Sequence, residues 1–363
     1  MTINSIATGS ASGRSSIASP PISTGSIRAA TEEGRAMLKD RRILVTGVTG
    51  KAVIPIAAAL ARDNEVWGQA RFTDPRDRQA IAALGIRPCA ADLDSGDLGE
   101  LPGDVDYVLH FAWMRAAREA LEQAMRVNVE GAGLILNHCR TAKAALVVSS
   151  TAVYLAHSDP WHRYREGDPV GPSATAAAAT SPICKVGLEA MARFAARTHD
   201  LPVTIARLNT VLGPHQAFYG KQVAAVLEGR EIVLPGETDT HSPIHSEDMI
   251  RQIEPLLDAA GRAPLTVNWC GDDVAISQET IARIGERAGR DVRFTVRSAP
   301  GLAGGNISDP EKRRSITGPC LTGFGEGFER LLDEMLDGAA PSLPQRDWAY
   351  GSGAQNQIFQ GIA

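Results

Sequence analysis

Short apolar runs alternate with longer amphipathic or alanine-rich stretches along the first part of the chain. The stretches between the runs, such as 53–62, 116–139 and 185–198, have the length and period of helices. Buried strands that alternate with helices predict parallel strands joined by right-handed crossovers. We therefore expect an α/β fold with a Rossmann-type doubly wound parallel sheet, which binds ligands at the carboxyl ends of its strands. The apolar runs of strand length are 43–45, 65–70, 107–109, 145–148 and 203–206.

The pattern changes after residue 214. A helix near 221–228 and a short strand at 231–234 precede a mixed region. These pieces are too small to hold separate cores, so we expect residues 215–338 to form mainly a smaller α/β substrate lobe, with some segments returning to the core of an NAD(P)-binding domain at 41–214. Residues 339–363, rich in Gly, Pro, Ser and Gln, are expected to form a surface tail.

The N-terminal residues 1–40 are expected to form a disordered extension. The first 28 residues hold eight serines, two arginines and no acidic residue, without a continuous apolar segment, so a secretory signal is not predicted. An organelle transit peptide shares this composition but is usually richer in arginine.

Composition narrows the classes of function. The 363 residues carry a net charge of -5 and no Lys/Arg cluster, so nucleic-acid binding is not expected. No apolar run reaches the roughly 18 residues that would span a bilayer. The five cysteines form no CxxC pair, so neither a metal site nor a disulfide framework is indicated. A cytoplasmic protein is the expectation.

A glycine-containing turn follows the first predicted strand. Residues 42–50 read RILVTGVTG, and Gly47 and Gly50 permit a tight turn and close approach of a pyrophosphate to the following helix. Two glycines can also merely connect a strand to a helix. Val53 stands at the third glycine of the usual pattern, so we expect slightly wider helix–strand spacing.

The end of the second predicted strand bears on cofactor choice. NAD-binding strands commonly end in an acidic residue that holds the ribose hydroxyls, whereas this strand ends Gln69-Ala70-Arg71. Arg71 could pair with a 2'-phosphate, so the sequence favours NADP over NAD. The alternative for Arg71 is a solvated surface charge.

Seven short motifs follow one another along the chain between residues 91 and 248. Together they resemble the extended short-chain dehydrogenase/reductase family, of the NAD-dependent epimerase/dehydratase type, across about residues 41–335. The segments 309–314 and 325–327 also resemble the C-terminal lobe of that family. The seven motifs are ADL at 91–93, LHFA at 109–112, NVEG at 128–131, VVSSTAVY at 147–154, Lys185 with Glu189, RLNTVLGP at 207–214 and IHSED at 244–248.

The resemblance implies roles for individual residues. Asp92 and Leu93 would flank the adenine, Phe111 and Ala112 would line the path to the nicotinamide, and Lys185 would hold the nicotinamide ribose. Ser150 matches the catalytic serine, whose hydroxyl would hydrogen-bond the reacting oxygen of the substrate. The alternative for Ser150 is a strand-end hydroxyl that bonds local backbone. The further cofactor-binding candidates are Gly47, Thr49, Gly50, Lys51, Ala52, Arg71, Trp113, Asn128, Leu208, Asn209 and Val211.

The catalytic tyrosine of the family's YxxxK motif is absent. Ser181 stands four residues before Lys185, and the nearest preceding tyrosine is Tyr164. An aliphatic hydroxyl is a far weaker acid than a phenol, whose pKa is about 10, so Ser181 is expected at most to position substrate. The groups left to move a proton, if one moves, are Lys185 with a pKa lowered by desolvation, Cys184 as a thiolate, Tyr164, His241 and His245.

A second departure concerns the substrate. Nucleotide-sugar members of the family commonly carry an Arg that grips the diphosphate just before the position of Ser242, and His241 stands there, which is a weaker phosphate clamp. Bulky Trp113, Met114 and Trp269 near predicted strand ends favour a compact, partly apolar carbonyl or hydroxyl compound.

Three functions remain open at this point. The leading hypothesis is an NADP-dependent oxidoreductase that acts on a small carbonyl or hydroxyl compound with a non-standard proton donor. The alternatives are an isomerase, dehydratase or lyase that keeps its cofactor bound, and a catalytically silent NAD(P) sensor. The resemblance also implies a homodimer formed through the helices near residues 116 and 185.

Overall fold

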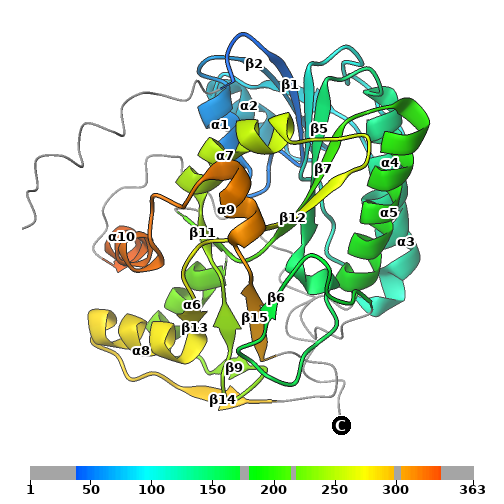
Figure 1. The fold of residues 1–363 in the computed structure, drawn as a ribbon. Helices are drawn as coiled ribbons and strands as arrows, with labels where there is room; N and C mark the ends of the chain where they lie inside the picture. Colours follow the sequence, from blue (N-terminus) through cyan, green and yellow to red (C-terminus); the bar gives the residue numbers. More distant parts are fainter. Residues whose placement is uncertain (1–37, 172–179, 214–217, 298–303, 337–363) are drawn as a thin grey trace, which may run out of the picture. The chain divides into compact units, whose positions relative to one another are not determined.

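The computed structural model describes residues 38–171, 180–213, 218–297 and 304–336. The predicted C-terminal tail, and the predicted N-terminal extension apart from residues 38–40, lie outside these ranges. Within them, seven parallel strands form one sheet in the order β12-β7-β5-β4-β1-β2-β3 (Figure 1). The predicted doubly wound α/β sheet is confirmed. Its strands are β1 (Arg42–Thr46), β2 (Glu65–Ala70), β3 (Arg87–Ala90), β4 (Tyr107–His110), β5 (Ala144–Ser150), β7 (Val203–Leu208) and β12 (Leu265–Trp269).

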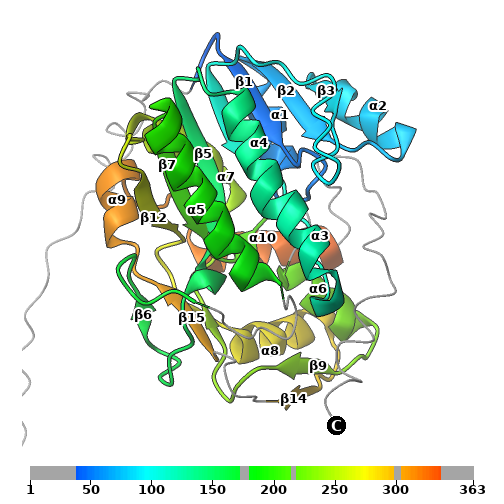
Figure 2. The same cartoon turned by 90° about the vertical axis from the view of Figure 1, so that its right-hand side faces the viewer.

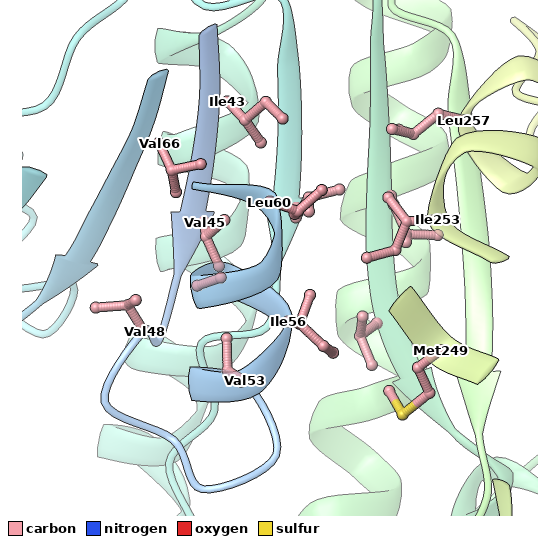
Figure 3. Close-up of a cluster of buried hydrophobic side chains, with 14 of the residues drawn as sticks. Ile43, Val45, Val48, Val53, Ile56, Leu60, Val66, Met249, Ile253 and Leu257 are labelled. Atoms are coloured by element: carbon pink, nitrogen blue, oxygen red, sulfur yellow. The ribbon is translucent and has the colours of Figure 1, made fainter. Parts of the chain in front are cut away.

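Helices cover both faces of this sheet (Figures 1 and 2). On one face, α1 (Ile54–Leu60) and α7 (Ser246–Asp258) pack side by side, and their apolar residues meet those of β1 in one cluster (Figure 3). On the other face lie α4 (Gly131–His138) and α5 (Ser181–His199), whose apolar side chains pack against β4 and β5. Burial of near-continuous apolar strands on both faces accounts for the parallel arrangement.

The chain after residue 214 contributes to both parts of the structure. β12 extends the large sheet and α7 covers it, although the sequence pattern named neither element. A separate apolar cluster joins α6 (Phe218–Leu227), α8 (Ser277–Ala288) and α10 (Phe324–Leu336). The division of the chain into domains at residue 214 stays a prediction.

Smaller sheets lie among these later segments. One has the strand order β13-β10-β15-β6, and two others pair β11 with β8 and β14 with β9. Their strands are β6 (Arg163–Tyr164), β8 (Val211–Leu212), β9 (Ile232–Leu234), β10 (Thr240–His241), β11 (Ile244–His245), β13 (Ala275–Ile276), β14 (Phe294–Val296) and β15 (Gly305–Ser308). The remaining helices are α2 (Pro75–Ala83), η1 (Arg118–Ala120), α3 (Leu121–Met125), η2 (Arg126–Glu130), η3 (Thr151–Val153) and α9 (Glu311–Thr317).

Candidate functional site

The strand order reverses between β1 and β4, which is where a doubly wound sheet opens a crevice at its carboxyl edge. The glycine turn after β1 meets the loop after β4 at this point. Gly47 has a φ of +69°, and a Cβ added to it would lie 2.7 Å from the Cα of Ala112. No other residue type fits there without displacing the second loop. The backbones of the glycine turn and of the loop after β4 therefore lie in close contact at the crevice.

The Thr46 hydroxyl joins the two loops and fixes the tautomer of His110. Its oxygen accepts the N–H groups of Phe111 and Ala112, both at 3.1 Å, and lies 3.0 Å from Nδ1 of His110. Because both lone pairs of the hydroxyl are used, its hydrogen is donated to Nδ1. Burial, with a contribution from the charge of Lys185, lowers the pKa of His110 to about 3, so the imidazole is neutral. Its hydrogen is therefore on Nε2, which is buried and has no hydrogen-bond partner within the described residues.

The third glycine position of the loop, Val53, is part of the hydrophobic core. The Val53 side chain is 6% exposed and packs in the same cluster as Val45 and Ile56 (Figure 3). The valine N–H donates to the carbonyl of Gly50 at 2.8 Å, which closes the turn before α1. Val53 thus fills the space between helix and strand that glycine would leave open.

The adenosine side of the crevice is built from the ends of β2 and β3. The buried Gln69 side chain accepts the N–H of Gly47 at 3.2 Å and donates to the carbonyl of Ala91 at 3.0 Å, so it braces the glycine turn. Ala70 ends β2, and the exposed Arg71 follows. Asp92 accepts the N–H of Asp94 at 3.0 Å, and Leu93 is buried. The carboxyl end of β2 therefore carries no acidic side chain that could hold the ribose hydroxyls.

Three cations lie close enough to influence one another near the glycine turn. The pKa of Lys221, on α6, is lowered by burial and then by the charges of Arg115 and Lys51. Lys51 belongs to the glycine turn with its neighbours Thr49 and Ala52, and Arg115 lies in the loop after β4. Positive charge from three separate segments is thus concentrated here.

The loop after β4 is held by Asn128 of η2. The amide of Asn128 accepts the N–H of Met114 at 2.7 Å and donates to its carbonyl at 2.8 Å. This pair of bonds fixes the loop that carries Trp113. The Trp113 ring centroid lies 3.7 Å from Nζ of Lys185, a cation–π contact. Asn128 therefore positions the loop, and its direct contact with a cofactor stays a prediction.

Lys185 is buried on α5 and faces the carboxyl end of β5. Its Nζ donates to the carbonyl of Val148 at 2.7 Å. Burial lowers the pKa of Lys185 to about 7 because desolvation disfavours the ammonium; Glu189 opposes this shift, and Arg115 adds to it. The amine is thus poised to exchange a proton near neutral pH.

One turn further along α5, Glu189 forms a buried ion pair that sequence reasoning did not assign. Its carboxylate accepts two bonds from Arg207 of β7, at 2.8 and 2.9 Å, and one from Ser149 at 2.8 Å. Burial would raise the pKa of Glu189, but the bonds from Arg207 outweigh it and hold this pKa below its ordinary value. The only sequence signal was the spacing of four residues from Lys185.

The other proton-donor candidates are placed less favourably. Cys184 is buried, its Sγ lies 3.7 Å from Sδ of Met125, and burial raises the pKa of its thiol. The Tyr164 hydroxyl accepts the N–H of His157 at 2.8 Å, and burial raises its pKa. His245 caps α7 by accepting the N–H of Glu247 at 3.3 Å. These surroundings disfavour the thiolate and the phenolate.

The two candidate serines differ in exposure. Ser150 ends β5 and is partly exposed, and its Oγ accepts the N–H of Ala152 at 3.2 Å, which leaves the hydroxyl hydrogen free to donate. Ser181 is the first residue of α5 and is 8% exposed. The structure therefore places Ser181 one helical turn before Lys185, where the sequence motif expects tyrosine.

Asn209, expected to touch the cofactor, joins β7 to later segments. Its amide donates to the carbonyl of Asn306 at 2.7 Å and to Oγ of Ser308 at 3.0 Å. The same side chain accepts the N–H groups of Thr210 at 2.7 Å and Ser242 at 3.2 Å. The side chain is therefore engaged within the protein. Its neighbours Leu208 and Val211, the other two candidates in this segment, pack against the core cluster around α1 and α7.

Two features are absent from the described ranges. No group of three or more His, Cys, Asp or Glu side chains in them is arranged to hold a metal ion. None of the helices there is long and apolar enough to cross a membrane.

Comparisons with known proteins agree with this geometry. A family model described as the NAD dependent epimerase/dehydratase family matches residues 43–269. No curated protein matches the chain. Many solved structures share the fold.

Three of these structures illustrate the similarity. UDP-glucuronic acid 4-epimerase from Bacillus cereus, solved with UDP-glucuronic acid and NAD, has a TM-score of 0.69 at 20% identity, covering 80% of this chain and 98% of that one. DesIV, a dTDP-glucose 4,6-dehydratase from Streptomyces venezuelae solved with NAD, has a TM-score of 0.68 at 21% identity, covering 80% and 95%. UDP-N-acetylglucosamine 4-epimerase from Methanobrevibacter ruminantium M1 has a TM-score of 0.68 at 19% identity, covering 83% and 98%. At these identities the likeness shows the fold alone.

Proposed function

Because this chain belongs to the NAD dependent epimerase/dehydratase family, whose members are enzymes, we propose that it performs hydride-exchange chemistry at a carbon–oxygen centre of a small hydroxy or carbonyl compound. The observation that carries this proposal is the buried Lys185, held behind Trp113 beside the strand that ends in Ser150. Membership of a family of enzymes favours a catalyst over the silent sensor.

The residues at the crevice fit a nicotinamide dinucleotide. Gly47 leaves a cradle that a Cβ would fill, and Lys51, Arg115 and Lys221 place positive charge where a pyrophosphate would lie. Asp92 and Leu93 would flank the adenine, and Phe111 and Ala112 would line the path to the nicotinamide. When bound, the cofactor supplies a site that accepts a hydride and can return it.

The chain's own residues would handle the proton. The Ser150 hydroxyl donates to the reacting oxygen and orients it, since its own oxygen is already held by the N–H of Ala152. The neutral Lys185 amine takes the proton that leaves this oxygen and returns it when the carbonyl is reduced. Ser181 would border the substrate one helical turn before Lys185, at the position where the family motif has a tyrosine.

His110 supports this role of Lys185. Its side chain points to the same face of β4 as Val108, which packs in one cluster with Leu188 of α5. The charge of Lys185 contributes to the lowered pKa of His110, so the two groups influence one another electrostatically. The neutral His110 would thus add no second positive charge near the Lys185 amine.

Two reactions share this step. The cofactor-retaining epimerase or dehydratase reaction is supported by the family description and by the relatives named above. The net oxidoreductase, which leads from the sequence alone, would differ in releasing a cofactor of changed redox state. The cofactor-retaining reaction is therefore our conclusion, and net oxidation is the second candidate.

Paired variants test the proposal. The purified enzyme is assayed on aldoses, ketoses and polyols for product formation and for absorbance at about 340 nm, which reports net reduction of the cofactor. Ser150→Ala and Lys185→Met are expected to lower kcat/KM by about 100-fold or more. The matched controls Ser315→Ala and Lys143→Met remove surface groups of the same kind and are expected to keep wild-type rates. Equal rates in site variants and controls would overturn the proposal, and steady accumulation of reduced cofactor would favour net oxidation.

A further inference from the structure

Four polar side chains form a connected row beside Ser150. Oγ1 of Thr210 lies 3.2 Å from Nδ1 of His241, and Nε2 of His241 lies 3.1 Å from Oδ2 of Asp239. The same Asp239 oxygen accepts the hydroxyl of Ser277 at 2.5 Å. His241, Asp239 and Ser277 are largely buried, and Thr210 is the partly exposed end of the row.

The row begins at the carboxyl edge of the large sheet. Ser150 and Leu208 are register partners on the adjacent strands β5 and β7, and Thr210 follows two residues later. Strands spaced about 4.8 Å apart with a rise of about 3.3 Å per residue place the Thr210 backbone roughly 8 Å from that of Ser150. Thr210 therefore borders the space in which Ser150 would meet a substrate.

One buried amide fixes the outer end of this row. Oδ1 of Asn209 accepts the N–H of Thr210 and the N–H of Ser242, the residue after His241. The chain segments that carry the hydroxyl and the imidazole are thereby tied to one point. The Phe218 ring, 4.8 Å from the His241 ring, packs beside the imidazole. The row is thus held in place from two sides.

The direction of the hydrogen bonds follows from the acceptor at the inner end. An ionised Asp239 has only lone pairs to offer, so His241 donates its Nε2–H to it and Nδ1 of a neutral imidazole is left to accept from Thr210. The Thr210 oxygen then presents its own lone pairs outward and suits a donor, such as an alcohol hydroxyl. With neutral His241 the row carries one negative charge, and with protonated His241 it carries none. In neither state does the row supply the net positive charge that a phosphate group requires.

We propose that Thr210 binds a hydroxyl group of an uncharged polyhydroxy substrate, with His241 and Asp239 as positioning residues that orient the Thr210 hydroxyl. This inference rests on the proposed function for the location of the substrate, and it deepens that function by naming the substrate class. It excludes a diphosphate at this point of the pocket. The Bacillus cereus epimerase, by comparison, was solved with the nucleotide-linked compound UDP-glucuronic acid.

The experiment compares free and nucleotide-linked forms of the same compounds. The full-length enzyme, with NAD and with NADP, is assayed on D-glucose with UDP-glucose, on D-glucuronic acid with UDP-glucuronic acid, and on a panel of aldoses, ketoses and polyols. We expect turnover of uncharged free compounds, with kcat/KM at least about tenfold above that of any nucleotide-linked form. Turnover confined to the nucleotide-linked forms would overturn the inference and leave the proposed function intact. Turnover of none of these compounds would overturn both.

Variants of the row then separate positioning from catalysis. Thr210→Val keeps the side-chain shape and is expected to raise KM about tenfold or more for the best free compound, with kcat changed less than about threefold. Thr210→Ser is expected to restore KM to within about threefold. If His241 acts through Thr210, the double variant Thr210→Val/His241→Gln has the same KM as Thr210→Val alone. Unchanged KM in Thr210→Val, with thermal unfolding and cofactor affinity as in wild type, would overturn the inference.

Discussion

The glycine turn before α1 and the first turns of α5 both lie at the carboxyl edge of the sheet, but they are built by opposite means. The glycine turn works by shape, because Gly47 lets the backbone approach Ala112 so closely that no side chain fits between them. The start of α5 works by charge, because it buries Lys185 and Glu189. In both regions the partner lies elsewhere in the chain, since Gly47 meets Ala112 and Glu189 meets Arg207, but the first contact is steric and the second is electrostatic.

The difference predicts where substitutions are most damaging. In the region of charge, removing one partner leaves an uncompensated buried ion, which is among the costliest defects in a protein. In the region of shape, the cost is local strain and displacement of the facing loop.

The largest effect is expected for Arg207→Met. Arg207 donates the two buried guanidinium bonds to the carboxylate of Glu189, so its loss is expected to lower the free energy of unfolding by about 3–5 kcal/mol. Arg193 forms an ion pair with the same carboxylate, but its side chain is 43% exposed. Arg193→Met is therefore expected to lower the free energy of unfolding by only about 0–1 kcal/mol. Urea unfolding of both variants measures the difference. Similar costs in the two would show that burial of the pair contributes little.

Gly47→Ala tests the region of shape. A left-handed backbone costs a residue with a Cβ about 1–2 kcal/mol, and the contact with Ala112 adds about 1–3 kcal/mol. Gly85 also has a positive φ, +77°, but the nearest atom to an added Cβ is 4.0 Å away, so Gly85→Ala isolates the backbone cost. We expect Gly47→Ala to lose cofactor affinity as well, measured by fluorescence titration with NADH and NADPH. Equal destabilisation and unchanged affinity in both variants would count against close approach at Gly47.

Separation along the chain explains what the sequence could predict. The strands and helices around the crevice and the glycine turn at Gly47 belong to local patterns of period or spacing, which predicted the α/β sheet, whereas Ser150 and Lys185 were named by the resemblance to family motifs. The Glu189–Arg207 pair joins residues 18 positions apart, and the Thr210–His241 contact joins residues 31 apart. Such pairs depend on which strands become neighbours, which a local pattern does not specify. The hydrogen bonds of Asn209 were not predicted for the same reason, since its partners come from β15 and the segment after β10.

The pH dependence of stability sharpens the description of Lys185. Its pKa of about 7 in the folded protein is lower than the 10.4 of an unfolded chain, so between these values the unfolded chain holds the extra proton. Raising the pH therefore favours the folded state. The cost of burying the Lys185 ammonium, which lowers the free energy of unfolding, is fully present below pH 7. From pH 7 to pH 9, wild type is expected to gain about 2 kcal/mol of unfolding free energy relative to Lys185→Met.

Lys143→Met is the control for that measurement, because Lys143 is exposed and pairs with Asp106 at the surface. Its difference from wild type is expected to stay constant between the two pH values. A constant difference for Lys185→Met as well would show that the amine keeps its charge in the folded protein, and the proposed proton transfer would then need another group.

The smallest effect is expected for Arg71→Ala, because Arg71 is exposed and would contribute only to the binding of the cofactor. The sequence favours NADP because Ala70 and Arg71 leave no carboxylate at the end of β2, whereas the Bacillus cereus epimerase and DesIV were solved with NAD. If Arg71 pairs with a 2'-phosphate, Arg71→Ala raises the Kd of NADPH about tenfold and leaves that of NADH unchanged. If NAD is the natural cofactor, the wild type binds NADH more tightly and Arg71→Ala changes neither Kd. Arg78→Ala, at a partly exposed arginine whose guanidinium lies over the Phe72 ring, controls for a general loss of positive charge. The two outcomes differ because the exposed Arg71 side chain adds affinity only when the ligand brings a phosphate to it.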